Sequence, residues 1–253
     1  TYPVQLERIL SHADPDTTYE VINLGIPHMQ ASNIYALFVT EGLPLEPDIV
    51  TFYEGNNDAS LIYWQLANAQ QTVSAGKSVL NFFAEYLVSM AFINSLLEDA
   101  AGDAAFSVAE IESATGAISA AFLDGLGKIA AVCADNDIRF IVANQQKQST
   151  YFENEELRGM TYTEELEAVK RVVEANEPVN QRVVAFIGHA VMMDELRDWA
   201  KGNSVPFVDV ITALDAERDS LLTHVHLSRR GNEVVATELS RKILESRAGG
   251  SGL

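Results

Sequence analysis

Three short stretches of the sequence carry groups suited to hydrolytic chemistry. In EGNND the side-chain amide of Asn57 offers a hydrogen-bond donor that can hold a developing oxyanion without taking part in proton transfer. In THVHLS, His226 belongs to the residue type that most often serves as general base and then acid near neutral pH. In NLGIP, Gly25 lets the backbone approach a ligand closely with its N–H free. Acyl transfer needs these three kinds of group together.

Each stretch also has an ordinary structural interpretation. A glycine after a strand is commonly a turn, an Asn-Asp pair commonly forms a loop, and a loop histidine commonly lies on the surface. What favours function is that each stretch ends a predicted strand or precedes a predicted helix. In open parallel sheets, ligands bind beyond the carboxyl ends of the strands, where helix N-termini point their N–H groups.

The chain alternates short apolar runs with longer helical patterns, which predicts a parallel sheet covered on both faces. We therefore expect an α/β fold with three α/β/α layers, flavodoxin-like, with a long helical insertion. Strands are expected at 19–25, 48–55, 138–145 and 205–211. Helices are expected at about 3–11, 31–41, 64–97, 108–136, 162–175, 189–202 and 230–246.

A single domain is expected over 1–246, with a helical insertion at 64–135 and a flexible tail or linker remnant at 247–253. The insertion either packs against the sheet or folds over a ligand cleft, where Phe82, Phe83, Tyr86 and Phe92 would line an acyl pocket. The apolar run 78–97 contains polar and charged residues, so a core helix is expected and a membrane span is not.

Composition excludes several classes of function. With 36 acidic and 17 basic residues, the formal charge of −19 disfavours nucleic acids and anionic lipid surfaces. Cys133 is the only cysteine, so no internal disulfide and no multi-cysteine metal site can form. The histidines show no recognised metal-ligand spacing and no glycine-rich phosphate loop occurs, so we expect no metal and no cofactor. The sequence does not indicate a compartment or an oligomeric state, and an extracytoplasmic location stays open.

Taken together, the motifs resemble those of the SGNH (GDSL-type) hydrolases. Block II of that family supplies an oxyanion-hole glycine, matched here by Gly25. Block III is Gly-x-Asn-Asp, matched by Gly55, Asn57 and Asp58, and block V carries the catalytic histidine in Asp-x-x-His-Leu-Ser, matched by His226. The resemblance implies an oxyanion hole built from Gly25 and Asn57, with Gly55 and Asp58 supporting it.

Two departures from the family pattern bear on activity. The Gly-Asp-Ser of block I, which carries the nucleophile, does not occur in the 253 residues, so we expect the first strand and its serine to lie upstream of Thr1. Thr223 stands where the family has the aspartate that orients the histidine. Asp219 or Glu217 would have to substitute, or Thr223 would hold the ring in a Ser-His dyad.

The resemblance implies a serine esterase that acts on a small-molecule ester, either a lipid or an acylated carbohydrate, through an acyl-enzyme. An alternative is a binding or scaffolding protein of the same fold that has lost the chemistry. A third interpretation, a flavodoxin-like phosphate or nucleotide binder, finds no motif in the sequence.

Overall fold

The structure of the protein, a computed structural model, describes residues 1–72, 106–153, 155–177 and 179–248. Within this part of the chain, three parallel strands pair in the order β1-β2-β3: β1 (Ile49–Tyr53), β2 (Arg139–Ala143) and β3 (Phe207–Val208). β1 and β2 are in register from Ile49 opposite Arg139 to Tyr53 opposite Ala143. Their carboxyl ends therefore stop at the same edge of the sheet.

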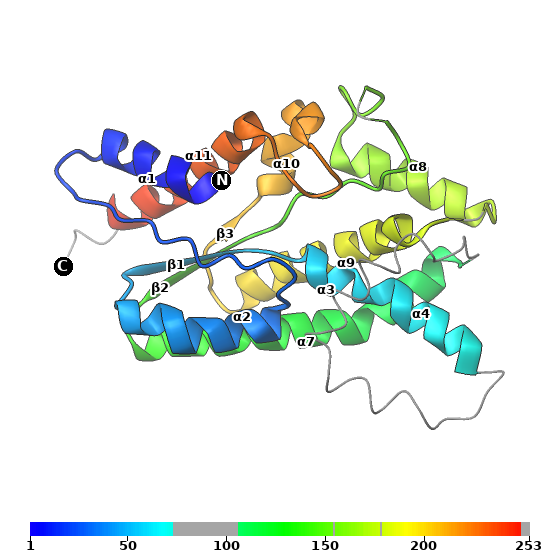
Figure 1. Cartoon of the computed structure of the whole chain (residues 1–253), viewed down its shortest axis with the longest axis horizontal. Coiled ribbons are helices and arrows are strands. Elements are labelled where there is room, and N and C mark those ends of the chain that lie inside the picture. The colour runs from blue at the N-terminus through cyan, green and yellow to red at the C-terminus, as the bar shows by residue number, and fades with distance from the viewer. Residues whose placement is uncertain (73–105, 154, 178, 249–253) are drawn as a thin grey trace.

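Helices cover both faces of this sheet (Figure 1). One face carries α1 (Tyr2–Ala13), α10 (Val210–Leu214) and α11 (Arg229–Ala248). The other carries α2 (Ala31–Leu37), α4 (Leu61–Thr72), α7 (Val108–Asp135) and α9 (Gln181–Gly202). The remaining elements are α3 (Asn56–Ala59), α8 (Tyr162–Glu174), a π-helix at Phe38–Gly42, and 3-10 turns at Leu43–Leu45 and Asp215–Ser220. The predicted three-layer α/β/α fold is confirmed.

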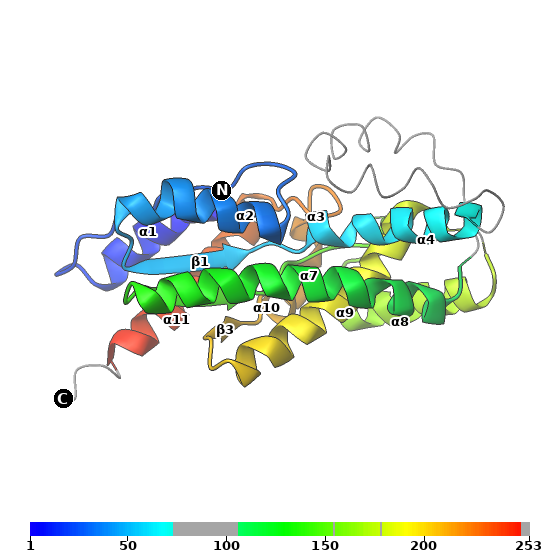
Figure 2. The same cartoon turned by 90° about the horizontal axis from the view of Figure 1, so that it is seen from below.

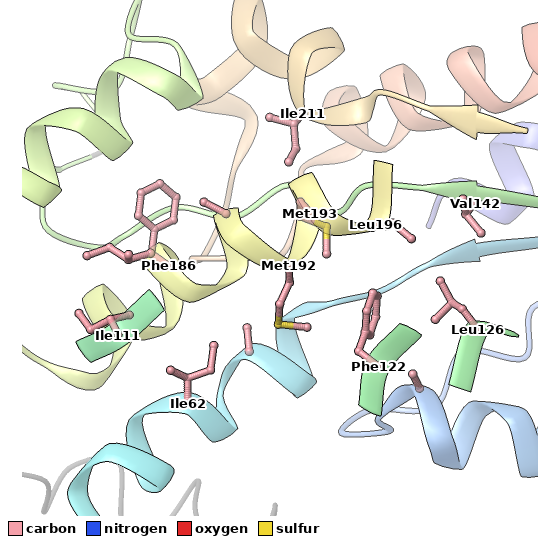
Figure 3. Packing of buried hydrophobic residues seen from close by; sticks show 14 of the residues in the cluster. Ile62, Ile111, Phe122, Leu126, Val142, Phe186, Met192, Met193, Leu196 and Ile211 are labelled. Atoms are coloured by element: carbon pink, nitrogen blue, oxygen red, sulfur yellow. The ribbon is translucent and has the colours of Figure 1, made fainter. Parts of the chain in front are cut away.

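The alternation of side chains along β2 explains the two faces. Phe140 and Val142 belong to the larger core cluster beneath α7 and α9, whereas Ile141 and Ala143 belong to the cluster beneath α1 and α11. Successive strand residues point to opposite faces, so a run of buried apolar residues is what a strand covered on both sides requires. Figure 3 shows the larger cluster, in which Phe122 and Leu126 of α7 lie near Val142 and the α9 residues Met192, Met193 and Leu196.

Local sequence signals fix where several helices begin. Ser107 accepts the backbone N–H of Glu110, and the Glu110 carboxylate accepts the N–H of Ser107, which makes a capping box at the start of α7. Thr161 and Glu164 do the same for α8. The Asn180 side chain accepts the first backbone N–H groups of α9.

The helical part of 64–135 that the structure describes lies in the core. α7 packs against α2, α4 and α9 and runs the length of that face (Figure 2). It is long and apolar enough to cross a membrane by composition alone, yet it buries Ile111, Phe122 and Leu126 within the protein. Residues Phe82, Phe83, Tyr86 and Phe92, offered above as an acyl pocket, and the run 78–97 lie outside the described residues.

Two predicted elements differ from the structure. The strand prediction for 19–25 is wrong: the segment forms no strand, and its residues Ile22 and Leu24 are exposed, as is the following Ile26. β1 pairs with β2 alone among the described strands, so it lies at an edge of the described sheet. In addition, β3 is shorter than 205–211 because Asp209 caps α10 immediately after it, and α9 begins at Gln181 rather than 189.

Candidate active site

A cleft of about 740 Å³ opens at the carboxyl ends of the strands. It is lined by the end of β1, by α3 and the start of α4, by the loop after β2, by the first turn of α9 and by the loop before α11. The residues that line it are Thr1, Pro27, His28, Gln30, Tyr53, Glu54, Asn56, Asn57, Ser60, Leu61, Trp64, Gln145, Lys147, Gln181, Arg182, Ala185, His224, Val225, His226, Leu227 and Asn232. Asn57 and His226, from opposite ends of the sequence, therefore face the same space.

His226 is exposed at the cleft in a short loop held by backbone hydrogen bonds. The Leu222 N–H donates to the His226 carbonyl at 2.7 Å, and Leu221 and Leu227 form an antiparallel bridge across the loop. Thr223 Oγ1 lies 2.8 Å from His226 Nδ1 and also accepts the His226 backbone N–H at 3.0 Å. The hydroxyl therefore sits where an orienting group for the imidazole belongs.

The two carboxylates considered as replacements for the family's aspartate engage arginines instead. Asp219 pairs with Arg158 at 3.3 Å, and Glu217 pairs with Arg230 at 3.1 Å. The side-chain group that the structure does place against the His226 ring is the neutral hydroxyl of Thr223.

Asn57 lies in the first turn of α3, directly after the strand. Its Nδ2 donates to the Met29 carbonyl at 2.9 Å, and its backbone N–H donates to Glu54 Oε1 at 2.9 Å. A carboxamide nitrogen carries two hydrogens, so one remains for a ligand after the bond to Met29. Asn57 thus both holds the neighbouring loop and presents a donor to the cleft.

Gly25 does not line the cleft. Its N–H donates to Asn23 Oδ1 at 3.0 Å, and the residue is exposed. Pro27 and His28, a little further along the same segment, do reach the cleft. The structure therefore brings together Asn57 and His226 and leaves Gly25 outside, so the role of its N–H stays a prediction.

Gly55 and Asp58 support this end of the sheet through packing and capping. A Cβ at Gly55 would lie 2.5 Å from Met193 Cε, so the strand end approaches α9 closely and a larger residue would displace the end of the Met193 side chain. Asp58 is buried, and its Oδ2 accepts the backbone N–H of Ala31 at the start of α2 at 3.1 Å. Burial raises the pKa of Asp58 to about 7, although that N–H opposes the shift.

Sequence reasoning missed two charged groups of the cleft. Lys147 is buried after β2, and its ammonium contacts Asn56 Oδ1. Glu54 directly follows β1 and has one carboxyl oxygen buried, and burial, followed by the nearby Asp58, raises its pKa to about 8. A lysine within the polar run NQQKQST, directly after an apolar strand, was the available signal for the first.

Comparison of the sequence with protein-family models and with curated proteins finds no match. The fold, by contrast, matches solved structures. A catalytic mutant of Axe2, an acetylxylan esterase from Geobacillus stearothermophilus, superposes with a TM-score of 0.52 at 14% identity, covering 96% of this chain and 80% of that one. The acetyl xylan esterase AlAXEase gives a TM-score of 0.51 at 15% identity, covering 97% and 89%.

A lipolytic protein assigned to the G-D-S-L family, from Desulfitobacterium hafniense, gives a TM-score of 0.50 at 14% identity over 96% of this chain and 87% of its own. At these identities the likeness concerns the arrangement of strands and helices. The chain therefore has the α/β/α fold of the SGNH, or GDSL-type, hydrolases.

Proposed function

We propose that this protein is a carboxylic ester hydrolase in which His226 is the general base and Asn57 a donor to the oxyanion. One observation carries the proposal: His226 and Asn57 line the same cleft at the strand ends. A hydroxyl orients the His226 ring, and the Asn57 carboxamide keeps one N–H donor for a ligand. The fold shared with acetylxylan esterases supports it.

In the proposed reaction, a serine hydroxyl attacks the ester carbonyl while His226 takes the hydroxyl proton. The carbonyl oxygen becomes an oxyanion that Asn57 Nδ2 stabilises. When the ester C–O bond breaks, His226 gives the proton to the leaving alcohol, and water then releases the acid from the acyl-enzyme by the same proton transfers.

The 253 residues do not contain the Gly-Asp-Ser motif that carries the nucleophilic serine in SGNH hydrolases. Ser60 is the serine among the described cleft residues, and its hydroxyl donates to the Asn56 carbonyl at 2.8 Å. We propose instead a serine upstream of Thr1. Thr1, just before α1, lines the same cleft as His226, which supports this proposal.

A short acyl ester of a carbohydrate is the substrate class that we propose. Trp64 offers an aromatic face at the cleft, and Gln145, Gln181 and Asn232 offer amide groups suited to hydroxyl-rich ligands. The two acetylxylan esterases of the same fold act on substrates of this kind by name, which supports the choice.

Labelling with a serine-reactive fluorophosphonate tests the function. The full-length encoded protein, and its His226→Ala variant, are labelled and digested, and the modified peptide is identified by mass spectrometry. A label upstream of Thr1 that His226→Ala abolishes is the expected result. A label on Ser60 would place the nucleophile at the junction of α3 and α4, and no label on the full-length protein would favour the non-catalytic binding protein.

A further inference from the structure

Two of the side chains on the described cleft wall are cationic. Lys147 comes from the loop after β2 with 1% of its surface exposed, and Arg182 comes from the first turn of α9 and is exposed. Both line the cleft that contains Asn57 and His226. The Lys147 ammonium contacts the neutral Asn56 side chain.

The two cations lie around His224, which also lines the cleft. The backbone N–H of Gln148, next to Lys147, donates to the His224 carbonyl at 2.9 Å, which ties the two loops together. Burial, with Lys147, Arg182 and His226 nearby, lowers the pKa of His224 to about 3. His224 is therefore an uncharged hydrogen-bonding group between two cations at neutral pH.

Negative charge is scarce on the described cleft wall. Glu54 supplies its carboxyl group, and with a pKa raised to about 8 it is mostly protonated at neutral pH. The chain as a whole has 36 acidic and 17 basic residues. Inside so acidic a protein, the two cationic side chains on the described cleft wall favour an anionic ligand.

We propose that Lys147, Arg182 and His224 form a subsite that binds a carboxylate carried by the ester substrate. Arginine and lysine make charge-assisted hydrogen bonds to carboxylates, and a partly desolvated cleft strengthens them. The carboxylate belongs to the part of the substrate beyond the ester group, since Asn57 and His226 occupy the reacting end. The inference rests on the proposed hydrolase function for calling the ligand a substrate, but binding itself does not depend on catalysis.

A pair of unreactive probes tests the subsite. 4-Acetamidobenzoate and 4-acetamidobenzamide share an acetyl amide, which mimics the ester, and differ in the carboxylate. Binding of each to the full-length protein is measured by NMR titration at pH 7 and low salt. We expect the carboxylate probe to bind about tenfold tighter, the value of one charge-assisted hydrogen bond at a partly exposed site.

Variants of the cleft residues test whether the preference for the carboxylate probe comes from the subsite. Arg182→Gln and Lys147→Met should each reduce it to about threefold or less, with folding checked by circular dichroism, because Lys147 is buried. Arg197→Gln is the matched control: it removes an exposed arginine from the same helix, away from the cleft, and should keep the full preference. Equal affinity for the two probes, including no binding of either, would overturn the subsite, as would a preference that neither cleft variant reduces. Hydrolysis of a neutral ester, p-nitrophenyl acetate, reports separately on the proposed function.

Discussion

At the scale of single residues, the contact between Thr223 and His226 sets how well the histidine can serve as a base. A hydroxyl can donate to Nδ1 or accept from it, whereas a carboxylate only accepts. Only when Nδ1 carries the hydrogen does Nε2 keep its lone pair for the substrate side. Thr223 therefore orients the ring without enforcing the productive tautomer or stabilising the imidazolium.

Restoring the carboxylate should therefore increase turnover. We expect Thr223→Asp to raise kcat for p-nitrophenyl acetate by about tenfold or more in the protein that carries the labelled serine. In other serine hydrolases, loss of the corresponding carboxylate lowers kcat by about 10⁴. Thr223→Val, which removes the hydroxyl, should lower kcat. A Thr223→Asp variant no faster than the parent would show that His226 does not act as the base.

The raised pKa of Glu54 predicts how the free energy of unfolding changes with pH. Its folded-state pKa of about 8 lies above the ordinary value of 4.5, so between these pH values the folded protein holds a proton that the unfolded chain has released. Stability contributed by the protonated form is therefore lost as pH rises through this range. The loss is on the order of a few kcal/mol by pH 8.

Glu54→Gln should remove this part of the pH dependence. Urea unfolding at pH 5 and pH 8 should show the variant gaining stability over the parent at pH 8 only. Asp58, with a pKa of about 7, acts in the same direction and leaves a residual slope in both proteins. Glu41→Gln, at an exposed position, is the control, and equal slopes for parent and Glu54→Gln would contradict the buried neutral carboxyl.

At the scale of elements, the close packing of α9 on α4 and α7 depends on Gly188. A Cβ there would lie 2.2 Å from Ile62 Cδ1 and 2.8 Å from Thr115 Oγ1. We expect Gly188→Ala to lower the free energy of unfolding by about 1–3 kcal/mol through overpacking. Denaturant titration measures it.

Gly116 provides the matched comparison within helix α7. A Cβ at this exposed position meets nothing within 4 Å, so Gly116→Ala should raise stability by about 0.5–1 kcal/mol through helix propensity. Should both substitutions shift stability equally, packing at the contact between α9 and its neighbours would not be the cause.

The elements that the sequence predicted best are those whose signals are local. The amphipathic spacing and the capping boxes at Ser107 and Thr161 place α7 and α8 within a residue or so of their observed ends. The segment 19–25 has strand-like composition but finds no pairing partner among the described strands, and composition cannot show that.

The residues of the candidate site divide in the same way, into those with a local sequence signal and those that depend on tertiary packing. The cleft at the strand ends, with Asn57 and His226 in it, follows from motif and topology. Lys147 and Glu54 could not be assigned in advance, because burial sets the pKa of Glu54 and brings Lys147 against Asn56, which is distant in the sequence.

At the scale of the whole molecule, charge is distributed unevenly. The formal charge of −19 belongs to a chain whose described cleft is lined by Lys147 and Arg182 and by a single carboxyl group. A like-charged surface keeps molecules apart in solution at low salt, and this repulsion weakens as added ions shorten its range to about 8 Å near physiological ionic strength.

The edge position of β1, with exposed Ile22, Leu24 and Ile26 on the preceding segment, then governs colloidal behaviour. A strand edge that has no pairing partner among the described strands invites pairing with another molecule. We expect sedimentation velocity of the 253-residue chain to show concentration-dependent dimers that salt promotes and that Leu24→Lys suppresses. Val4→Lys, at an exposed position on α1, should leave them unchanged, and a monomer at every salt concentration would contradict the expectation. Low ionic strength is thus the storage condition under which this chain should associate least.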